Sequence, residues 1–145
     1  MTNPDEVRRS IERQNAKAIH AYATGDADAL AAIFAEHAWQ MPPNLPAVVG
    51  RTAIRDFWRG AFGWGQWQFT FETQTVSVSG PMAVERGKYV LRFIAGASAP
   101  PGMSSFEDRG NYLVHWRLDD DKQWRIMADA PVSELPLPGT SCDAA

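Results

Sequence analysis

The chain has 145 residues, of which 45% are hydrophobic and 11% aromatic, enough for one domain around a single core. Its net charge of -3, with Lys and Arg scattered along the sequence, argues against nucleic acid as the main partner. Because no run approaches the roughly 18 apolar residues of a membrane-spanning helix and the N-terminus is polar, we expect a cytoplasmic protein without membrane contact.

The first part of the chain has helical periodicity. Hydrophobic residues recur at helical spacing between Asp5 and Thr24, which predicts a long amphipathic helix. Gly25 is a typical helix stop and Asp26 a typical N-cap, so a second helix is predicted over residues 27–35. The two helices should pack as a hairpin.

A short strand and a third helix follow. Residues 39–41 are predicted as a strand that ends at Pro42, because proline cannot continue a central ladder. Residues 44–50 show neither helical nor strand periodicity in their hydrophobic residues. The third helix should begin at Arg51 or Thr52, end at Phe62 and bury Trp58.

The second half of the chain reads as strands. Alternating patterns and turn residues predict strands over residues 66–78, 82–94, 111–118 and 123–132, with a mobile loop over residues 95–105. The predicted fold class is α+β, with three helices packed on a curved, mainly antiparallel sheet. We expect a single domain over residues 1–135 and a flexible tail over residues 136–145, which holds the lone Cys142 and therefore allows no intramolecular disulfide.

Four segments carry a resemblance to a known superfamily: residues 25–38 (GDADALAAIFAEHA), 50–58 (GRTAIRDFW), 109–117 (RGNYLVHWR) and 124–129 (WRIMAD). They resemble the cone-shaped α+β barrels of nuclear transport factor 2, ketosteroid isomerase and the SnoaL-like polyketide cyclases, and their spacing extends from about residue 5 to 135. The resemblance implies the fold but not one reaction, because this fold hosts isomerases, cyclases, dehydratases, epoxide hydrolases and proteins without catalysis.

The resemblance excludes two specific activities. The catalytic Asp, the oxyanion-hole Tyr and the protonated Asp of ketosteroid isomerases fall on Pro42, Ala18 and Val114, so that mechanism lacks its groups here. Epoxide hydrolases of this fold use an Asp-Arg-Asp set, which Asp108, Arg109 and Asp129 resemble in composition. Adjacent residues on a strand point to opposite faces, however, so Asp108 and Arg109 should not share a site.

The same resemblance implies which residues line the cone. These are Tyr22, Gln40, Asn44, Trp58, Glu85, Tyr89, Leu91, Asp108, Tyr112, Val114, Trp116, Met127 and Asp129. Strand alternation agrees in part, since residues 85, 89 and 91 share one face, as do residues 112, 114 and 116, and residues 127 and 129.

Asp129 is the candidate catalytic residue. It is a carboxylate in an otherwise apolar strand, where Asp is disfavoured, and SnoaL-like cyclases place their general base at a similar position on the last strand. A structural role for Asp129, as a buried hydrogen-bonded carboxylate, stays open. Glu85 and Asp108 either face the cavity or pair at its rim with cations such as Lys88 and Arg109.

The sequence favours a cofactor-independent protein. His20, His37 and His115 do not have the spacing of a metal site, and no nucleotide-binding motif is present. We expect a small apolar or aromatic ligand that contains a carbonyl group. Asp129 would act as base in an isomerisation, cyclisation or dehydration, and Tyr89, Asn44 and Gln40 would orient the ligand.

A non-catalytic ligand-binding or dimerisation module of the same fold is the alternative. In either case a homodimer is expected through the outer face of the sheet, where Leu113, His115, Trp124 and Ile126 should form an apolar patch.

Overall fold

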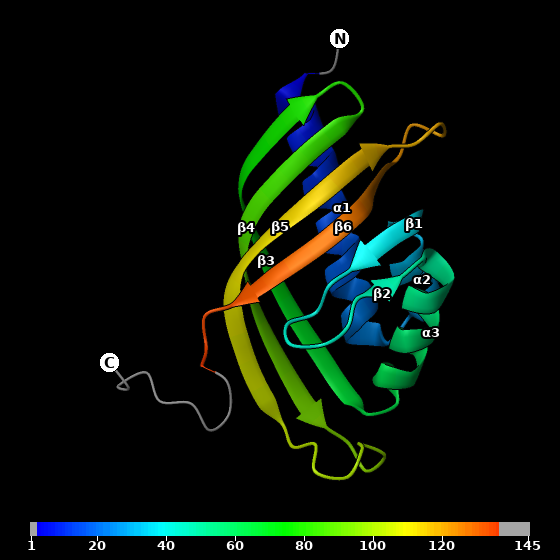
Figure 1. Ribbon diagram of the computed structural model, residues 1–145, viewed down its shortest axis with the longest axis vertical. Helices are drawn as coiled ribbons and strands as arrows, with labels where there is room; N and C mark the ends of the chain where they lie inside the picture. Colours follow the sequence, from blue (N-terminus) through cyan, green and yellow to red (C-terminus); the bar gives the residue numbers. More distant parts are fainter. Residues whose placement is uncertain (1–2, 137–145) are drawn as a thin grey trace.

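Three helices pack against one curved six-stranded sheet in the computed structural model, which describes residues 3–136 (Figure 1). The helices are α1 (Pro4–Thr24), α2 (Ala27–Ala31) and α3 (Arg51–Phe62). The strands are β1 (Phe34–Gln40), β2 (Val48–Val49), β3 (Gly65–Ser79), β4 (Met82–Ala95), β5 (Phe106–Leu118) and β6 (Trp124–Ser133), in the sheet order β2-β1-β6-β5-β4-β3. The predicted α+β class is confirmed. Cys142 and the tail from residue 137 onward lie outside the described residues.

Helix α1 ends at Thr24 as predicted and begins at Pro4, one residue before the predicted start. The Asn3 side chain accepts a hydrogen bond from the Asp5 amide at 2.9 Å, and Gly25 ends the helix in the left-handed conformation with φ 68°. The buried side of α1 includes Ile11, Asn15, Ala18 and Tyr22, at spacings of three and four residues. This side faces the sheet.

The second helix is shorter than predicted. It ends at Ala31, and the chain is already a strand from Phe34, which pairs with Ile126 of β6 in parallel. The amide of Ile126 donates to the carbonyl of Ile33 at 2.9 Å, and the Arg51 side chain donates to the carbonyl of Phe34 at 2.8 Å. These long-range bonds outweigh the helical pattern of residues 32–35. The two-residue strand β2, which pairs with the end of β1, was not predicted.

Strands β3 to β6 form the predicted antiparallel meander. Burial alternates strictly along β4, where residues 83, 85, 87, 89, 91 and 93 point into the fold. Strand β5 begins at Phe106, five residues earlier than predicted, because residues 106–110 pair with residues 89–93 near the end of β4. In Figure 1, α1 lies across one face of this sheet while α2 and α3 gather beside β1 and β2.

The outer face of the sheet differs from the prediction at two positions. Trp124 and Ile126 are buried, because a β-bulge at Met127 changes the direction of every β6 side chain before it. The exposed outer patch instead consists of Trp39, Val84, His115, Ala128 and Leu113, in which residues 39, 128, 115 and 84 are successive cross-strand neighbours. No helix of residues 3–136 is long and apolar enough to cross a membrane.

We predict that the outer patch mediates a homodimer, since Leu113 and Trp39 are 52% and 49% exposed. Leu113→Asp would place a charge in this interface, so it should lower the mass measured by light scattering at micromolar concentration from that of a dimer to that of a monomer. Thr70→Asp, at an exposed position on β3 outside the patch, is the matched control and should leave the mass unchanged. A wild-type protein that is monomeric at every accessible concentration contradicts the prediction.

Candidate functional site

A cavity of about 470 Å³ lies between the helices and the inward face of the sheet. Eleven of the residues that line it are aromatic: Tyr22, Phe34, Phe57, Trp58, Trp64, Trp67, Phe69, Phe71, Tyr89, Phe106 and Tyr112. A volume of this size fits a small organic ligand, and the dominance of rings over polar groups favours a flat, apolar one.

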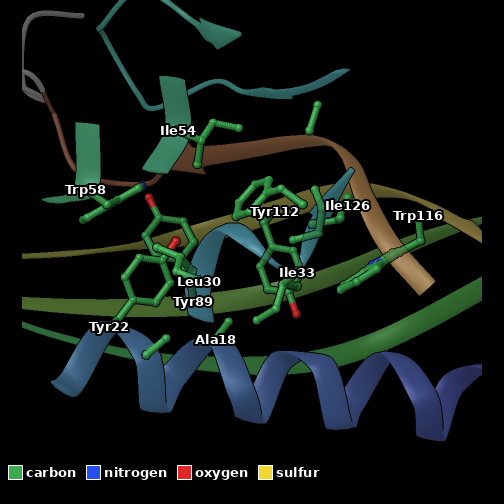
Figure 2. Packing of buried hydrophobic residues seen from close by; sticks show 14 of the residues in the cluster. Ala18, Tyr22, Leu30, Ile33, Ile54, Trp58, Tyr89, Tyr112, Trp116 and Ile126 are labelled. Carbon is green, nitrogen blue, oxygen red and sulfur yellow. The ribbon is translucent and has the colours of Figure 1, made fainter. Parts of the chain in front are cut away.

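The rings around Trp58 are packed edge to face. Its ring centroid lies 4.9 Å from that of Tyr22 and 5.1 Å from that of Trp67, with interplanar angles of 74° and 85°. Tyr22 in turn contacts Phe69 at 4.2 Å between centroids. Figure 2 shows Trp58, Tyr22 and Tyr89 grouped at one end of the buried cluster, with Trp116 at the other end. Such contacts fix the ring orientations that shape the cavity.

Asp129 lies in the wall of this cavity on β6. The bulge at Met127 is responsible for its surroundings, since His115 pairs with Ala128 and Trp116 pairs with Ile126, which leaves Met127 as the extra residue. Ile126 and Asp129 consequently both line the cavity, whereas Met127 does not. Asp129 pairs with Val114 of β5 and Gln40 of β1, so both of its neighbouring strands position it.

The side chain of Gln40 links three groups of the site. The indole N–H of Trp58 donates to Gln40 Oε1 at 2.8 Å, which fixes the amide so that Nε2 points the other way. Nε2 donates to the Tyr22 hydroxyl oxygen at 3.3 Å and, more weakly, to Asp129 Oδ2 at 3.5 Å. The second bond is at the limit of hydrogen-bonding distance, so Asp129 keeps most of its acceptor capacity.

Burial in this apolar cavity raises the pKa of Asp129 from 3.8 to about 6; the Gln40 hydrogen bond lowers it in part and the negative charge of Glu85 raises it further. Burial and the charge of Asp129 raise the pKa of the Tyr22 phenol above its usual range. Near neutral pH the site therefore combines a carboxylate base with a neutral phenol. Since the Tyr22 oxygen already accepts from Gln40, its O–H is the group left to donate to a ligand.

Glu85 is fully buried and accepts four hydrogen bonds. Asn15 Nδ2, Thr73 Oγ1 and Tyr112 Oη donate to Oε2 at 2.9, 2.8 and 2.6 Å, and Trp116 Nε1 donates to Oε1 at 3.0 Å. Neutral donors, rather than cations, thus satisfy this carboxylate. Gly87 provides the space, because a Cβ there would lie 2.4 Å from the Tyr112 hydroxyl oxygen.

Asp108 forms a second polar cluster in the cavity wall. The Tyr89 hydroxyl donates to Oδ2 at 2.7 Å, the Ser133 hydroxyl donates to Oδ1 at 2.5 Å, and the Arg109 amide donates to Oδ1 at 2.9 Å. The Arg109 side chain does not line the cavity and is exposed. Asp108 and Arg109 thus point apart, as strand alternation predicts.

The structure brings together most of the side chains that the sequence proposes for the cone. Around the cavity lie Tyr22, Gln40, Asn44, Trp58, Tyr89, Leu91, Asp108, Tyr112, Val114 and Asp129, with Asn44 at its rim. Three proposed residues do not line it: Glu85 and Trp116 lie beneath the wall and bond to each other, and the bulge excludes Met127. Neither Lys88 nor Arg109 pairs with the carboxylate of Glu85 or Asp108 through its side chain among the described residues.

Sequence reasoning missed several lining residues. One of them is Asn15, which lies on the same side of α1 as Ile11, Ala18 and Tyr22. A polar residue within such an apolar stripe indicates a polar contact inside the fold and could have identified Asn15. Ser133 follows the predicted end of the last strand and carries no local signal. Pro42, Ala18 and Val114, which replace the functional groups of ketosteroid isomerases, all line the cavity, so these parts of its wall are apolar.

No cluster of three His, Cys, Asp or Glu side chains within residues 3–136 could hold a metal ion. A separate polar depression between α2 and α3 is lined by Arg51, Arg55 and Arg125. Two of these arginines are already engaged, since Arg51 donates to the carbonyl of Phe34 at 2.8 Å and Arg125 pairs with Asp121 at 2.7 Å. The aromatic cavity is therefore the better candidate site.

Comparison with solved structures finds the same fold in proteins of low sequence identity. A nuclear transport factor 2-like superfamily protein from Salmonella enterica serovar Typhimurium has a TM-score of 0.78 and 13% identity, with 99% of each chain covered. A ketosteroid isomerase-like protein from Erwinia carotovora has a TM-score of 0.73 and 18% identity, over 88% of this chain and 96% of that one. A candidate scytalone dehydratase from Novosphingobium aromaticivorans has a TM-score of 0.78 and 20% identity, over 93% of this chain and 89% of that one.

No curated protein matches the sequence at a significant level. The family model described as the SnoaL-like domain, in contrast, matches residues 16–126, which is most of the chain and includes α3, β3, β4 and β5 in full. The protein belongs to the SnoaL-like domain family.

Proposed function

We propose that the protein is an isomerase, cyclase or dehydratase in which Asp129 removes a proton from a carbon next to a carbonyl group of a mostly apolar substrate. The observation that carries the proposal is the state of Asp129, whose pKa is raised to about 6 by burial and whose only side-chain hydrogen bond within residues 3–136 is the 3.5 Å contact to Gln40. A carboxylate with this pKa is largely ionised at pH 7 and is basic enough for proton transfer.

Tyr22 is the natural partner of this base. Its phenol stays protonated, is aligned by Gln40 and lies close enough to Asp129 for the carboxylate charge to raise the pKa of the phenol. A substrate carbonyl oxygen that accepts the Tyr22 hydrogen bond gains stabilisation as it becomes an enolate oxygen. The proton lost from carbon is then held by Asp129 and is returned to another carbon in an isomerisation or to a leaving oxygen in a dehydration.

The walls of the cavity support the substrate class. Trp58, Trp67 and Phe69 offer ring faces and edges to a flat molecule. Proteins of the same fold are described as ketosteroid isomerase-like and as a candidate scytalone dehydratase, which supports the choice of an isomerase or a dehydratase.

We predict that the protein accelerates exchange of the α-hydrogens of 2-tetralone with D2O, a reaction that reports proton abstraction without knowledge of the natural product. Asp129→Asn should reduce the enzyme-dependent exchange rate by roughly 10²- to 10⁴-fold, because Asn cannot accept the proton. Tyr22→Phe should reduce it by roughly 10²-fold, the usual effect of removing one donor to the developing oxyanion. Mass spectrometry of the recovered ketone measures both rates.

Glu107→Gln is the matched control for the exchange experiment. Glu107 is exposed at the cavity rim and pairs with Arg92 at 2.8 Å, so its loss should leave the exchange rate unchanged. A fully active Asp129→Asn variant excludes Asp129 as the base. The same panel with 2-indanone tests whether the result depends on one ketone.

We also predict that Asp129→Asn stabilises the protein above pH 6. Because the folded-state pKa of Asp129 is raised from 3.8 to about 6, the folded protein binds this proton more tightly than the unfolded chain does. The contribution of Asp129 to stability is therefore fully present below about pH 4 and is lost as the pH rises through about 6. At pH 8 the free energy of unfolding of Asp129→Asn should exceed that of the wild type by roughly 1–3 kcal/mol.

Urea unfolding at pH 4 and pH 8 measures this difference, which should be small at pH 4. If Asp129→Asn is instead the less stable protein at pH 8, Asp129 has a structural role as a hydrogen-bonded anion, and the catalytic proposal loses its physical basis.

A further prediction concerns Trp58. Trp58→Phe removes one ring and the hydrogen bond that fixes Gln40, so it should keep the fold but weaken naphthalene binding roughly 2- to 10-fold. Quenching of the remaining tryptophan fluorescence measures the affinity. Trp39→Phe, a change on the opposite face of the sheet, is the control and should bind as the wild type does. Equal affinity in both variants would place the probe outside this cavity.

A further inference from the structure

The charges around the cavity are all of one sign. Its lining within the described residues includes the acidic side chains Glu107, Asp108 and Asp129 and no Lys, Arg or His. Glu85 adds a further carboxylate beneath the wall, and its charge acts on Asp129. An anionic ligand would therefore enter a low-dielectric space with like charges and no counter-ion, which is strongly unfavourable.

The carboxylates differ in how far they are neutralised. Glu107 pairs with Arg92 at the rim, and Glu85 is saturated by four neutral donors. Asp108 accepts three hydrogen bonds, all from neutral groups. Asp129 has only the weak bond from Gln40. Asp108 and Asp129 thus act on the cavity without a cation to balance them among the described residues.

Tyr89 lies where the fields of these two carboxylates overlap. Its hydroxyl donates to Asp108 at 2.7 Å, and burial together with the charges of Asp108 and Asp129 raises the pKa of the phenol above its usual range. Because its only proton is directed to Asp108, the Tyr89 oxygen can offer lone pairs to a ligand. A positive group beside Tyr89 would meet two carboxylates, an acceptor oxygen and an aromatic ring.

The aromatic walls suit the same kind of ligand. Trp58 and Trp67, two residues of the lining, are nearly perpendicular to each other, so the cavity presents ring faces from more than one direction. Ring faces carry the negative part of the aromatic quadrupole and attract organic cations, most strongly when the site is shielded from water. Unpaired carboxylates and surrounding aromatic rings are the combination that recognises ammonium groups.

We infer that the cavity selects an organic cation, namely an apolar or aromatic molecule with a protonated or quaternary nitrogen, which lies beside Tyr89 with Asp108 and Asp129 as its counter-ions. The inference concerns the charge of the ligand and does not depend on proton abstraction. It is compatible with a carbonyl-containing substrate that also bears a basic nitrogen.

Three probes of similar shape test the inference by titration calorimetry: benzyltrimethylammonium, its uncharged carbon analogue neopentylbenzene, and the anion phenylmethanesulfonate. The wild-type protein should bind the cation at least about tenfold more tightly than the neutral analogue, and should bind the anion least. Asp129→Asn and Asp108→Asn should each reduce the ratio of cation to neutral affinity at least about threefold. Glu72→Gln, which removes an exposed carboxylate on β3 that does not line the cavity, should leave that ratio unchanged.

The affinity for neopentylbenzene reports whether the cavity of each variant is intact, because this probe uses only apolar contacts. The inference is overturned if the neutral or the anionic probe binds the wild type as tightly as the cation does. It is also overturned if neither Asn variant changes the ratio of cation to neutral affinity, or if none of the three probes binds at millimolar concentration. If the ratio of cation to neutral affinity is near one but the protein still accelerates exchange of the α-hydrogens of 2-tetralone, the charge preference alone is overturned. A strong cation preference without exchange would overturn only the proposed function.

Discussion

The hydrogen bonds to the buried carboxylate of Glu85 are the interaction on which the packing of α1 against the sheet depends. Its four donors come from three other elements, Asn15 on α1, Thr73 on β3, and Tyr112 and Trp116 on β5. The network therefore fixes how the long helix lies on the sheet. Removing any one donor would leave a buried anion partly unsatisfied, which typically costs about 1–3 kcal/mol, more than replacing an ordinary surface contact.

The same network affects the chemistry of the site. Glu85 holds Tyr112 and Asn15 in the wall, and its negative charge is among the causes that raise the pKa of Asp129, together with burial. A structural carboxylate and a candidate base thus share one low-dielectric space, in which the charge of Glu85 disfavours the charged form of Asp129. Tyr22, Tyr89 and Tyr112, whose phenols all stay protonated, separate the carboxylates with neutral polar groups instead of cations.

The sequence predicts the elements with a strong period and misses those fixed by distant contacts. The helical period and Gly25 locate α1, and the strict alternation of β4 gives its inward face. Residues 32–35 look helical, yet pairing with β6 makes Phe34 part of a strand. One bulge, at Met127, accounts for the errors at Met127, Trp124 and Ile126, because an extra residue reverses the facing of the side chains before it and leaves no local mark in the sequence.

The neighbours of Asp129 on its own strand follow from that irregularity. In a regular β6 with the observed pairing of Val114 and Asp129, Ile126 would point outward and Met127 into the fold, and the apolar packing around the carboxylate would change. The bulge places Ile126 and Asp129 on the same wall, so the carboxylate is surrounded by apolar surface on its own strand and by rings from the helices. Desolvation is the largest cause of its raised pKa. Burial among apolar side chains, rather than a catalytic motif, thus gives one ordinary Asp its raised pKa.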